Sequence, residues 1–341
     1  MFRYLLRRIL ILIPTLFGIT LLSFVIINLT PGSPVEQRLQ QLQFGGAISG
    51  GAGANRGESG VSREVIEALN KQYGFDKPVI ERYGIWLKNI SRLDFGESSK
   101  YEEPVTDLII SKLPVSLMFG LVSFFLTYLI CIPLGVWKAV RNGTLFDRAT
   151  TIVLFAAYSI PPVMLGILLL VFFAGSSHFD WFPMGGVVSD QYESLSTFGK
   201  IGDRLHHAAL PLFCYMIGGF TYLTFMTKNS MLDVVKLDYV RTAEAKGLGA
   251  KSVYLKHALR NALIPIVTGM SGLLGVFFTG SILIETIFNL DGMGLLSFTS
   301  VNSRDYNVLM GLIFFQSLLF LIGRLLTDFL YALVDPRIDF A

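Results

Sequence analysis

The sequence predicts an all-α integral membrane protein with about six transmembrane helices. Of its 341 residues, 52% are hydrophobic and only 16% are charged, whereas soluble domains carry roughly 25% charged residues. The mean hydropathy is +0.57, and long uncharged apolar runs recur along the chain. A hydrocarbon core about 30 Å thick requires about 20 apolar residues in a helix. In lipid, the backbone groups of such a run must also be paired within the segment, which a helix achieves.

Six apolar runs divide the chain into membrane and aqueous parts. The first run follows Arg3, Arg7 and Arg8, as the apolar part of a signal peptide does. It is too long for a signal peptide, however, and lacks a small-residue cleavage site, so we predict that it is retained as a membrane helix. The runs lie at about 9–29, 115–137, 149–174, 208–227, 263–284 and 307–323.

Positive charge in the short connections predicts the orientation of the chain. Lysine and arginine gather between the second and third spans and again between the fourth and fifth. If six helices alternate, both groups lie on the same side as the basic N-terminus. Cytoplasmic loops retain such residues, so both termini are predicted to be cytoplasmic. The basic residues of these two connections are Lys138, Arg141 and Arg148, followed by Lys228, Lys236, Arg241, Lys246, Lys251, Lys256 and Arg260.

This topology predicts three regions. Residues 1–29 form a cytoplasmic N-terminal segment and the first helix, residues 30–113 an external subdomain, and residues 114–341 the transmembrane core with a polar loop at 228–262. The subdomain is either a platform for an external partner or a cap over the helix ends. Its glycine-rich stretch 45–60 cannot bury apolar surface and is predicted to be a flexible loop. Two amphipathic helices are predicted after it, with the apolar faces Val65, Ile66, Leu69, Tyr73 and, after Pro78, Val79, Tyr83, Trp86, Ile90.

The polar loop between the fourth and fifth spans is predicted to be structured. Asp238 is placed as the N-cap of a short helix that runs through Lys246, and Gly247 as its C-terminal stop. A second, amphipathic helix is predicted to run into the fifth span. Its apolar stripe comprises Leu255, Ala258, Leu259, Ala262, Leu263 and Ile266, and its polar face comprises Lys256, His257, Arg260 and Asn261.

Three interpretations of this loop differ in kind. Contact with anionic lipid headgroups explains the lysines, but it leaves the glycine turn and the two-helix pattern unexplained. A DNA-binding helix-turn-helix is disfavoured, because a module anchored in the membrane at both ends could hardly enter a major groove. No nucleic-acid partner is therefore predicted. A rigid element that a cytoplasmic partner pushes against a membrane helix accounts for all of these features.

The stretch "DYVRTAEAKGLGAKSVYLKHALRNALIPIVTG" resembles the cytoplasmic coupling loop of permease subunits in ATP-binding-cassette importers, specifically those of the dipeptide and oligopeptide branch. The resemblance covers most of the chain and includes "LDFGES", "SIPPVMLG", "ETIFNLDGMG" and the terminal "LVDPRIDF". The general loop pattern begins with Glu-Ala-Ala, whereas this chain has Arg241, Thr242 and Ala243, and Glu244 stands where a basic residue is expected. The glycine-rich insertion resembles that of longer-peptide relatives, including the type that admits microcin C.

The resemblance implies a permease that imports peptides and supplies no chemistry of its own. It implies no catalytic residue, no metal site and no cofactor in this chain, with ATP and Mg bound by two partner ATPase subunits. The other implied partners are a second permease subunit, an external solute-binding protein, a peptide substrate and the lipids of a bacterial inner membrane. The residues implied to dock onto an ATPase are Arg241, Thr242, Ala243, Glu244, Ala245, Lys246, Gly247 and Leu248.

An ion-coupled secondary transporter is the main rival from another class. Such transporters place ionisable groups near the bilayer midplane, and the six uncharged runs contain none. Glu285 comes closest, at the outer end of the fifth span, where an outer gate or a helix-end hydrogen bond is expected instead of an ion relay. The candidate outer-gate residues are Glu285, Asp291, Gly292 and Gly294.

The substrate is the least determined feature. Importers of nickel or another non-peptide solute share the implied architecture, and a membrane enzyme or scaffold would leave the two-helix loop unexplained. Polar side chains within the spans could line a peptide pathway, and they fit interhelical hydrogen bonds equally well. These side chains are Tyr128, Tyr158, Thr221, Tyr222 and Thr224.

Overall fold

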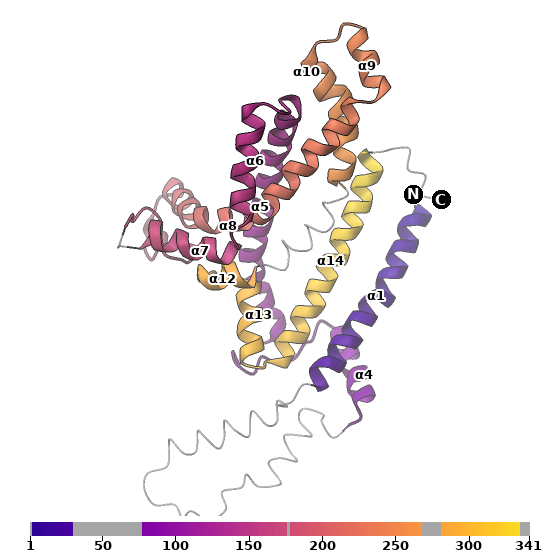
Figure 1. Ribbon diagram of the computed structural model, residues 1–341. Coiled ribbons are helices and arrows are strands. Elements are labelled where there is room, and N and C mark those ends of the chain that lie inside the picture. The colour runs from indigo at the N-terminus through magenta and orange to yellow at the C-terminus, as the bar shows by residue number, and fades with distance from the viewer. Residues whose placement is uncertain (1, 30–76, 176–177, 268–280, 335–341) are drawn as a thin grey trace, which may run out of the picture. The chain divides into compact units, whose positions relative to one another are not determined.

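The computed structural model describes residues 2–29, 77–175, 178–267 and 281–334 (Figure 1). Over these residues the chain is helical and contains no β-strand, which confirms the predicted all-α class. The chain divides into two compact units. Unit 1 comprises residues 1–9, 111–296 and 318–341, and unit 2 comprises residues 10–110 and 297–317.

Three helices within the described residues are long and apolar enough to cross a membrane. They are α5 (Val105–Val140), α8 (Thr197–Val235) and the first 20 residues, Tyr306–Leu325, of α14 (Tyr306–Val334). Each contains one of the predicted apolar runs. Helix α1 (Phe2–Leu29) contains the first predicted run.

The predicted number of six spans is only partly tested. The predicted fifth span, 263–284, is helical up to residue 267, and residues 268–280 lie outside the described part of the chain. The predicted third span is a bent pair of helices. If this pair crosses the membrane as a single span, the described residues contain four candidate spans. The total of six therefore stays a prediction.

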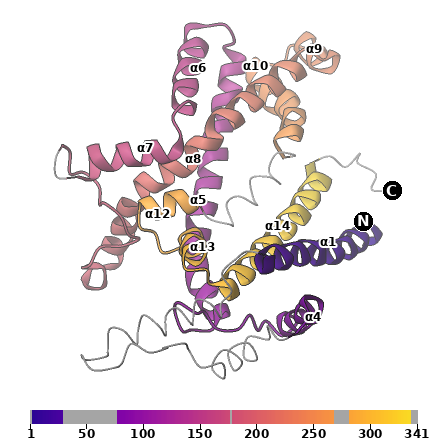
Figure 2. The same ribbon diagram turned by 60° about the horizontal axis from the view of Figure 1, so that its bottom comes forward.

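The bend in the third span follows from its proline pair. Helix α6 (Leu145–Tyr158) and the pair α7 (Pro162–Leu169) and η1 (Leu170–Ala174) meet at 91°, and Figure 2 shows α7 turned away from α6. A residue that precedes proline is pushed out of the helical conformation, and Pro161 accordingly has φ −56° and ψ 135°. Pro162 then begins α7, where a missing backbone N–H costs nothing. The proline pair therefore accounts for the break between α6 and α7.

Helices α5 and α8 approach each other closely at Gly135. A Cβ added to Gly135 would lie 2.5 Å from Cβ of Thr227 and 2.7 Å from the backbone oxygen of Thr224. Small residues allow such backbone contact between membrane helices. A buried apolar cluster lies one turn before this contact on both helices. It joins Cys131 of α5 and Leu223 of α8 to Ile266, at the start of the predicted fifth span.

Unit 2 contains the described part, up to residue 110, of the segment predicted to be external. Helix α4 (Val79–Ile90) begins after Pro78 and buries Tyr83 and Ile90, which confirms the helix predicted after Pro78. The Tyr83 hydroxyl lies 3.0 Å from Oγ1 of Thr20 on α1, and Phe24 packs on the same tyrosine. The glycine-rich stretch 45–60 and the first predicted external helix lie outside the described residues.

The remaining short elements are η2 (Tyr192–Ser194), α12 (Ile282–Ile287) and α13 (Met293–Asn302).

Candidate functional site

The polar loop folds into an elbow, which we define as residues 238–258. It consists of α9 (Asp238–Ala245), the one-turn α10 (Ala250–Ser252) and the π-helical turn η3 (Val253–Ala258). Figure 1 shows α9 and α10 beyond one end of α8. The chain continues from η3 as an α-helix over residues 259–267, which we call the return helix.

Gly247 provides the turn of the elbow. Its φ is +76°, a left-handed conformation that glycine adopts without strain. The N–H of Gly247 donates to the Glu244 oxygen at 2.9 Å, and the N–H of Leu248 donates to the Ala243 oxygen at 3.4 Å. This pair of bonds is the Schellman motif, which satisfies the last carbonyl groups of a helix. The predicted helix stop at Gly247 is confirmed.

Two details of the predicted loop are wrong. Leu237 is the N-cap of α9 and Asp238 is its first helical residue, so the Asp238 side chain does not cap the helix. Leu255 is 45% exposed, and Val253 is buried in its place. The reason is the π-helical turn, which fits about one more residue into a turn than an α-helix does. Val253 therefore aligns with Ala258, five residues on, and the predicted buried stripe holds only from Ala258 onward.

Specific contacts hold the elbow to its neighbours. Val240 and Ala243 of α9 are buried against Val253 of η3. The Tyr239 hydroxyl accepts a hydrogen bond from Nδ2 of Asn261 at 2.6 Å, which joins α9 to the return helix. The Oγ of Ser230 donates to the Ala262 oxygen at 2.8 Å, which joins α8 to the return helix. The elbow, the end of α8 and the return helix are therefore connected at three points.

Seven of the eight predicted docking residues are exposed. Arg241 and Thr242 lie on the outer side of α9, and the stretch from Glu244 to Leu248 forms its exposed end. Ala243 is 6% exposed and packs inside the elbow. Its side chain therefore contributes to the packing of the elbow, and the exposed surface is formed by its neighbours.

A buried charge cluster joins three helices near the elbow. Nζ of Lys228 on α8 lies 2.8 Å from both carboxylate oxygens of Asp147 on α6. Nζ of Lys138 on α5 lies 3.1 Å from Oδ1 of the same aspartate. It also donates to the hydroxyls of Thr150 and Thr151 at 2.6 and 2.9 Å. Lys138 is 0% and Asp147 5% exposed, so one buried carboxylate pairs with a fully buried cation and with a second cation, Lys228, that is 12% exposed.

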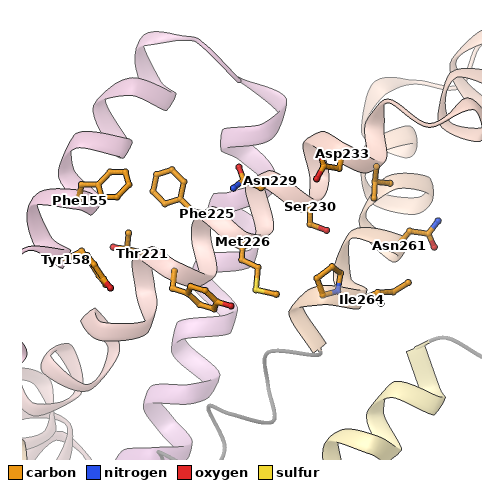
Figure 3. Close-up of a pocket in the computed structure, with 13 residues that line it drawn as sticks. Phe155, Tyr158, Thr221, Phe225, Met226, Asn229, Ser230, Asp233, Asn261 and Ile264 are labelled. Carbon is orange, nitrogen blue, oxygen red and sulfur yellow. The ribbon is translucent and has the colours of Figure 1, made fainter. Parts of the chain in front are cut away.

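A cavity of about 840 Å³ lies between α6, α8 and the return helix. Figure 3 shows Asn229, Ser230 and Asp233 of α8 on one side and Asn261 and Ile264 of the return helix on the other. Most of the lining surface is apolar. The polar side chains of Asn229, Ser230, Asp233 and Asn261 lie at the part of the cavity near the elbow. The full lining is Phe155, Tyr158, Thr221, Tyr222, Phe225, Met226, Asn229, Ser230, Asp233, Val234, Asn261, Ile264 and Pro265.

The polar residues predicted within the spans separate into two groups. Tyr158, Thr221 and Tyr222 line the cavity. The Thr221 hydroxyl nevertheless donates to the Leu154 oxygen at 2.9 Å, so it also serves as an interhelical link. Thr224 is 0% exposed and Tyr128 packs beside the buried Cys131 cluster; neither lines the cavity.

Glu285 on α12 is a buried carboxylate with several hydrogen-bond donors. Its Oε1 accepts from the hydroxyls of Ser116 at 2.8 Å and Tyr215 at 3.1 Å. Its Oε2 accepts from the N–H of Leu295 at 3.0 Å, in the first turn of α13. Ser116 Oγ also accepts from the N–H of Met293. Glu285 and Ser116 together satisfy N–H groups that a helix start leaves unpaired, as the helix-end interpretation requires.

The other candidate gate residues surround this carboxylate. A Cβ on Gly292 would lie 2.6 Å from Oε2 of Glu285, and one on Gly294 would lie 3.0 Å from the same atom. Asp291 points outward instead, with a side chain 67% exposed, and pairs with Lys112 at 2.5 Å. The four residues therefore lie together, and their role as an outer gate stays a prediction.

Comparison with known proteins places this arrangement in a family. The family described as "Binding-protein-dependent transport system inner membrane component" matches residues 131–340. This chain belongs to that family. The matched residues include the elbow, the buried charge cluster, the cavity and Glu285.

Two relatives match this permease along nearly its whole length. A peptidoglycan transport system permease protein, YejB, of Agrobacterium fabrum is 43% identical over 99% of this chain and 98% of its own. An oligopeptide transport system permease protein, AppB, of Bacillus subtilis is 37% identical over 99% of both chains. The resemblance to permeases of the peptide branch of these importers is confirmed.

A solved structure supports the fold of the permease. A chain of the inward-facing MetNI methionine ABC transporter superposes with a TM-score of 0.52 at 16% identity, over 67% of this chain and 96% of that chain. At this identity the likeness concerns the fold alone. With the family description and the membrane-length helices, it makes the permease a multi-pass protein of a bacterial inner membrane.

Sequence patterns did not reveal the charge cluster of the permease. Lys138 and Lys228 each follow directly after an apolar run, so the sequence predicts that both are charges of cytoplasmic loops. A partial signal was present at Thr144 and Asp147, where a hydroxyl residue precedes an acid by three positions, as at many helix starts. Thr144 is indeed the N-cap of α6. That pattern predicts a cap, and only the fold shows that both lysines converge on Asp147.

We predict that Gly292→Ala destabilises the permease by about 1–3 kcal/mol, the usual cost of adding a methyl group to a filled site. The added carbon would lie 2.6 Å from both Glu285 Oε2 and Ser116 Oγ. Thermal unfolding in detergent measures the loss. Gly202→Ala is the matched control, because a Cβ at Gly202 on α8 meets nothing within 4 Å. Equal stability of the two variants would contradict the tight packing around Glu285.

Proposed function

We propose that this chain is the passive transmembrane subunit of an ATP-driven peptide importer, and that its elbow is the site where an ATPase subunit docks. One observation carries the proposal. The helix that leaves the elbow is the same helix whose Asn261, Ile264 and Pro265 line the 840 Å³ cavity. A displacement of the elbow therefore moves one wall of the cavity directly.

The contacts of the elbow support transmission of force. A coupling element must move as one body, because a loose loop would absorb the displacement. The Tyr239–Asn261 and Ser230–Ala262 hydrogen bonds and the buried Val240–Val253 contact fix the elbow to the return helix. When two ATPase subunits close on ATP, they would bring two such elbows together and shift the cavity between inward-facing and outward-facing states.

The partners follow from this division of labour. The permease binds no nucleotide itself, and ATP and Mg belong to two ATPase subunits at the cytoplasmic side. A second, similar permease subunit completes the pathway, and a solute-binding protein delivers the substrate from outside. In this arrangement the elbow and both termini are cytoplasmic, as the distribution of lysine and arginine predicts.

Peptides are the proposed substrate class because of the relatives. Permeases named for peptidoglycan and oligopeptide transport match the whole chain at 43% and 37% identity. A cavity with mostly apolar walls and a few polar groups suits ligands whose side chains vary while their backbone amides stay constant. We therefore place longer peptides and peptide-like antibiotics ahead of nickel chelates or other solutes.

The test combines isolation of the complex with an uptake assay. We expect the tagged chain, purified in mild detergent, to recover an ATPase and a second permease. We also expect cells to take up a labelled oligopeptide only while cytoplasmic ATP is present. Uptake that continues after ATP depletion, with the ion gradients intact, would overturn the proposal in favour of a secondary transporter. Uptake that nickel inhibits and unlabelled peptides do not would overturn the substrate class alone.

A further inference from the structure

A second groove lies between the end of α5 and the elbow. It has a volume of about 480 Å³ and an almost wholly apolar lining. On α5 it is lined by residues of the last two turns, and on the other side by α10, η3 and the start of the return helix. The lining residues that matter here are Trp137, Val140, Lys251 and Leu255.

The apolar side chains of this groove are open to their surroundings. Trp137 is 48% exposed, and Val140 and Leu255 are each 45% exposed. Large apolar groups that stay exposed together mark a surface that something else covers. For a multi-pass membrane protein, the most abundant apolar material available to cover them is the lipid acyl chain.

The position of the groove suits a lipid rather than a soluble ligand. Trp137 is the last residue of the predicted second span, and Lys138 and Arg141 follow it. Tryptophan is enriched at the boundary between hydrocarbon and headgroups, where an apolar ring and a polar N–H are both accommodated. The groove thus opens at the level where acyl chains meet their headgroups.

Two basic side chains lie beside the apolar lining of the groove. Lys251 lines the groove itself and is exposed. The guanidinium of Arg141 lies 5.3 Å from the centre of the Trp137 ring, and this ring forms part of the groove. Two positive charges next to an apolar groove complement a molecule that carries a phosphate at the end of a hydrocarbon chain.

We propose that this groove binds an anionic phospholipid, with one acyl chain between α5 and η3 and its phosphate beside Lys251 and Arg141. The lipid would fill the gap between a membrane helix and the elbow. The inference requires the chain to lie in the membrane at the predicted depth, and it does not require the substrate to be a peptide. Its failure is therefore distinguishable from failure of the proposed function.

Tryptophan quenching by brominated lipids tests the proposal. The chain has three tryptophans, so Trp86→Phe together with Trp181→Phe leaves Trp137 as the only tryptophan of this chain. The same complex with Trp137→Phe as well supplies the fluorescence of the partner proteins for subtraction. The complete chain, assembled with its co-purified partners, is reconstituted into vesicles of phosphatidylcholine that contain increasing amounts of phosphatidylglycerol. We expect phosphatidylglycerol with brominated acyl chains to quench Trp137 at several-fold lower mole fraction than brominated phosphatidylcholine.

A matched pair of variants locates the headgroup. Lys251→Gln should lower the preference for phosphatidylglycerol by about fivefold, the effect of one cation near a membrane surface. Lys256→Gln is the control, since Lys256 lies in the adjoining η3, is exposed and does not line the groove. An equal effect of the two variants would reduce the finding to general surface charge and overturn the specific site.

Two further outcomes would overturn the proposal. One is equal quenching by the two brominated lipids. The other is no quenching by either in the assembled complex, which would mean that a protein partner covers the groove. Native mass spectrometry of the unmodified chain provides a second measurement that does not depend on the tryptophan replacements. There, phosphatidylglycerol should remain bound at higher occupancy than phosphatidylcholine, and Lys251→Gln should remove that difference.

Discussion

Gly247→Val should lower the amount of ATPase recovered with the permease by about tenfold or more, while the free energy of unfolding falls by no more than about 1–3 kcal/mol. Gly247 has φ +76°, where a β-branched residue is strained by roughly 1–3 kcal/mol. A Cβ there meets nothing within 4 Å, so the effect acts through the backbone. The turn would open, the bonds to Ala243 and Glu244 would be lost, and the exposed residues 244–248 would change position. Quantitative immunoblotting of the purified complex measures the ATPase.

Gly249 supplies the control for this experiment. It is two residues away, equally exposed and equally open around its Cβ position. Its φ of −61° and ψ of 144° suit any L-residue, so Gly249→Val should keep the ATPase. Gly247→Asn should fall between the two, because asparagine tolerates the left-handed region better than valine does. Retention of the ATPase by Gly247→Val would contradict the docking role of the turn.

The features predicted correctly from the sequence are those that depend on nearby residues. Long apolar runs became α5, α8 and α14, because a helix is the only way for such a run to pair its backbone in lipid. Gly247 ended α9 because glycine adopts the left-handed conformation without strain. Each of these properties is contained in a short stretch of sequence.

The features that were missed depend on distant residues or on a small change of helical register. The π-helical turn at Val253–Ala258 buried Val253 instead of Leu255, and an assumed period of 3.6 residues cannot anticipate that shift. Which polar side chains line the cavity depends on how α6, α8 and the return helix pack. Thr221 and Thr224 lie on one helix only three residues apart, yet only Thr221 reaches the cavity.

The charge cluster is the clearest case of a missed feature, and it leads to the second prediction. Asp147→Asn should destabilise the permease by about 3–5 kcal/mol, the usual cost of removing one partner from a buried ion pair. Lys138 is 0% exposed, so the variant would leave its charge buried without a counterion. The three helices α5, α6 and α8 meet at this carboxylate, so its loss should loosen the base from which the elbow extends. Thermal unfolding in detergent measures the change.

Two comparisons separate this effect from ordinary surface electrostatics. Glu193→Gln removes an ion pair with Lys200 in which the glutamate side chain is 89% exposed, and such pairs contribute roughly 0–1 kcal/mol. The double change Asp147→Leu with Lys138→Met should recover part of the loss, because apolar side chains replace the two most deeply buried charges of the cluster. Lys228 has a side chain 12% exposed and can extend toward water along its flexible stem. If Asp147→Asn were no more harmful than Glu193→Gln, the cluster would not hold the three helices together, and the rigid base proposed for the elbow would have to lie elsewhere.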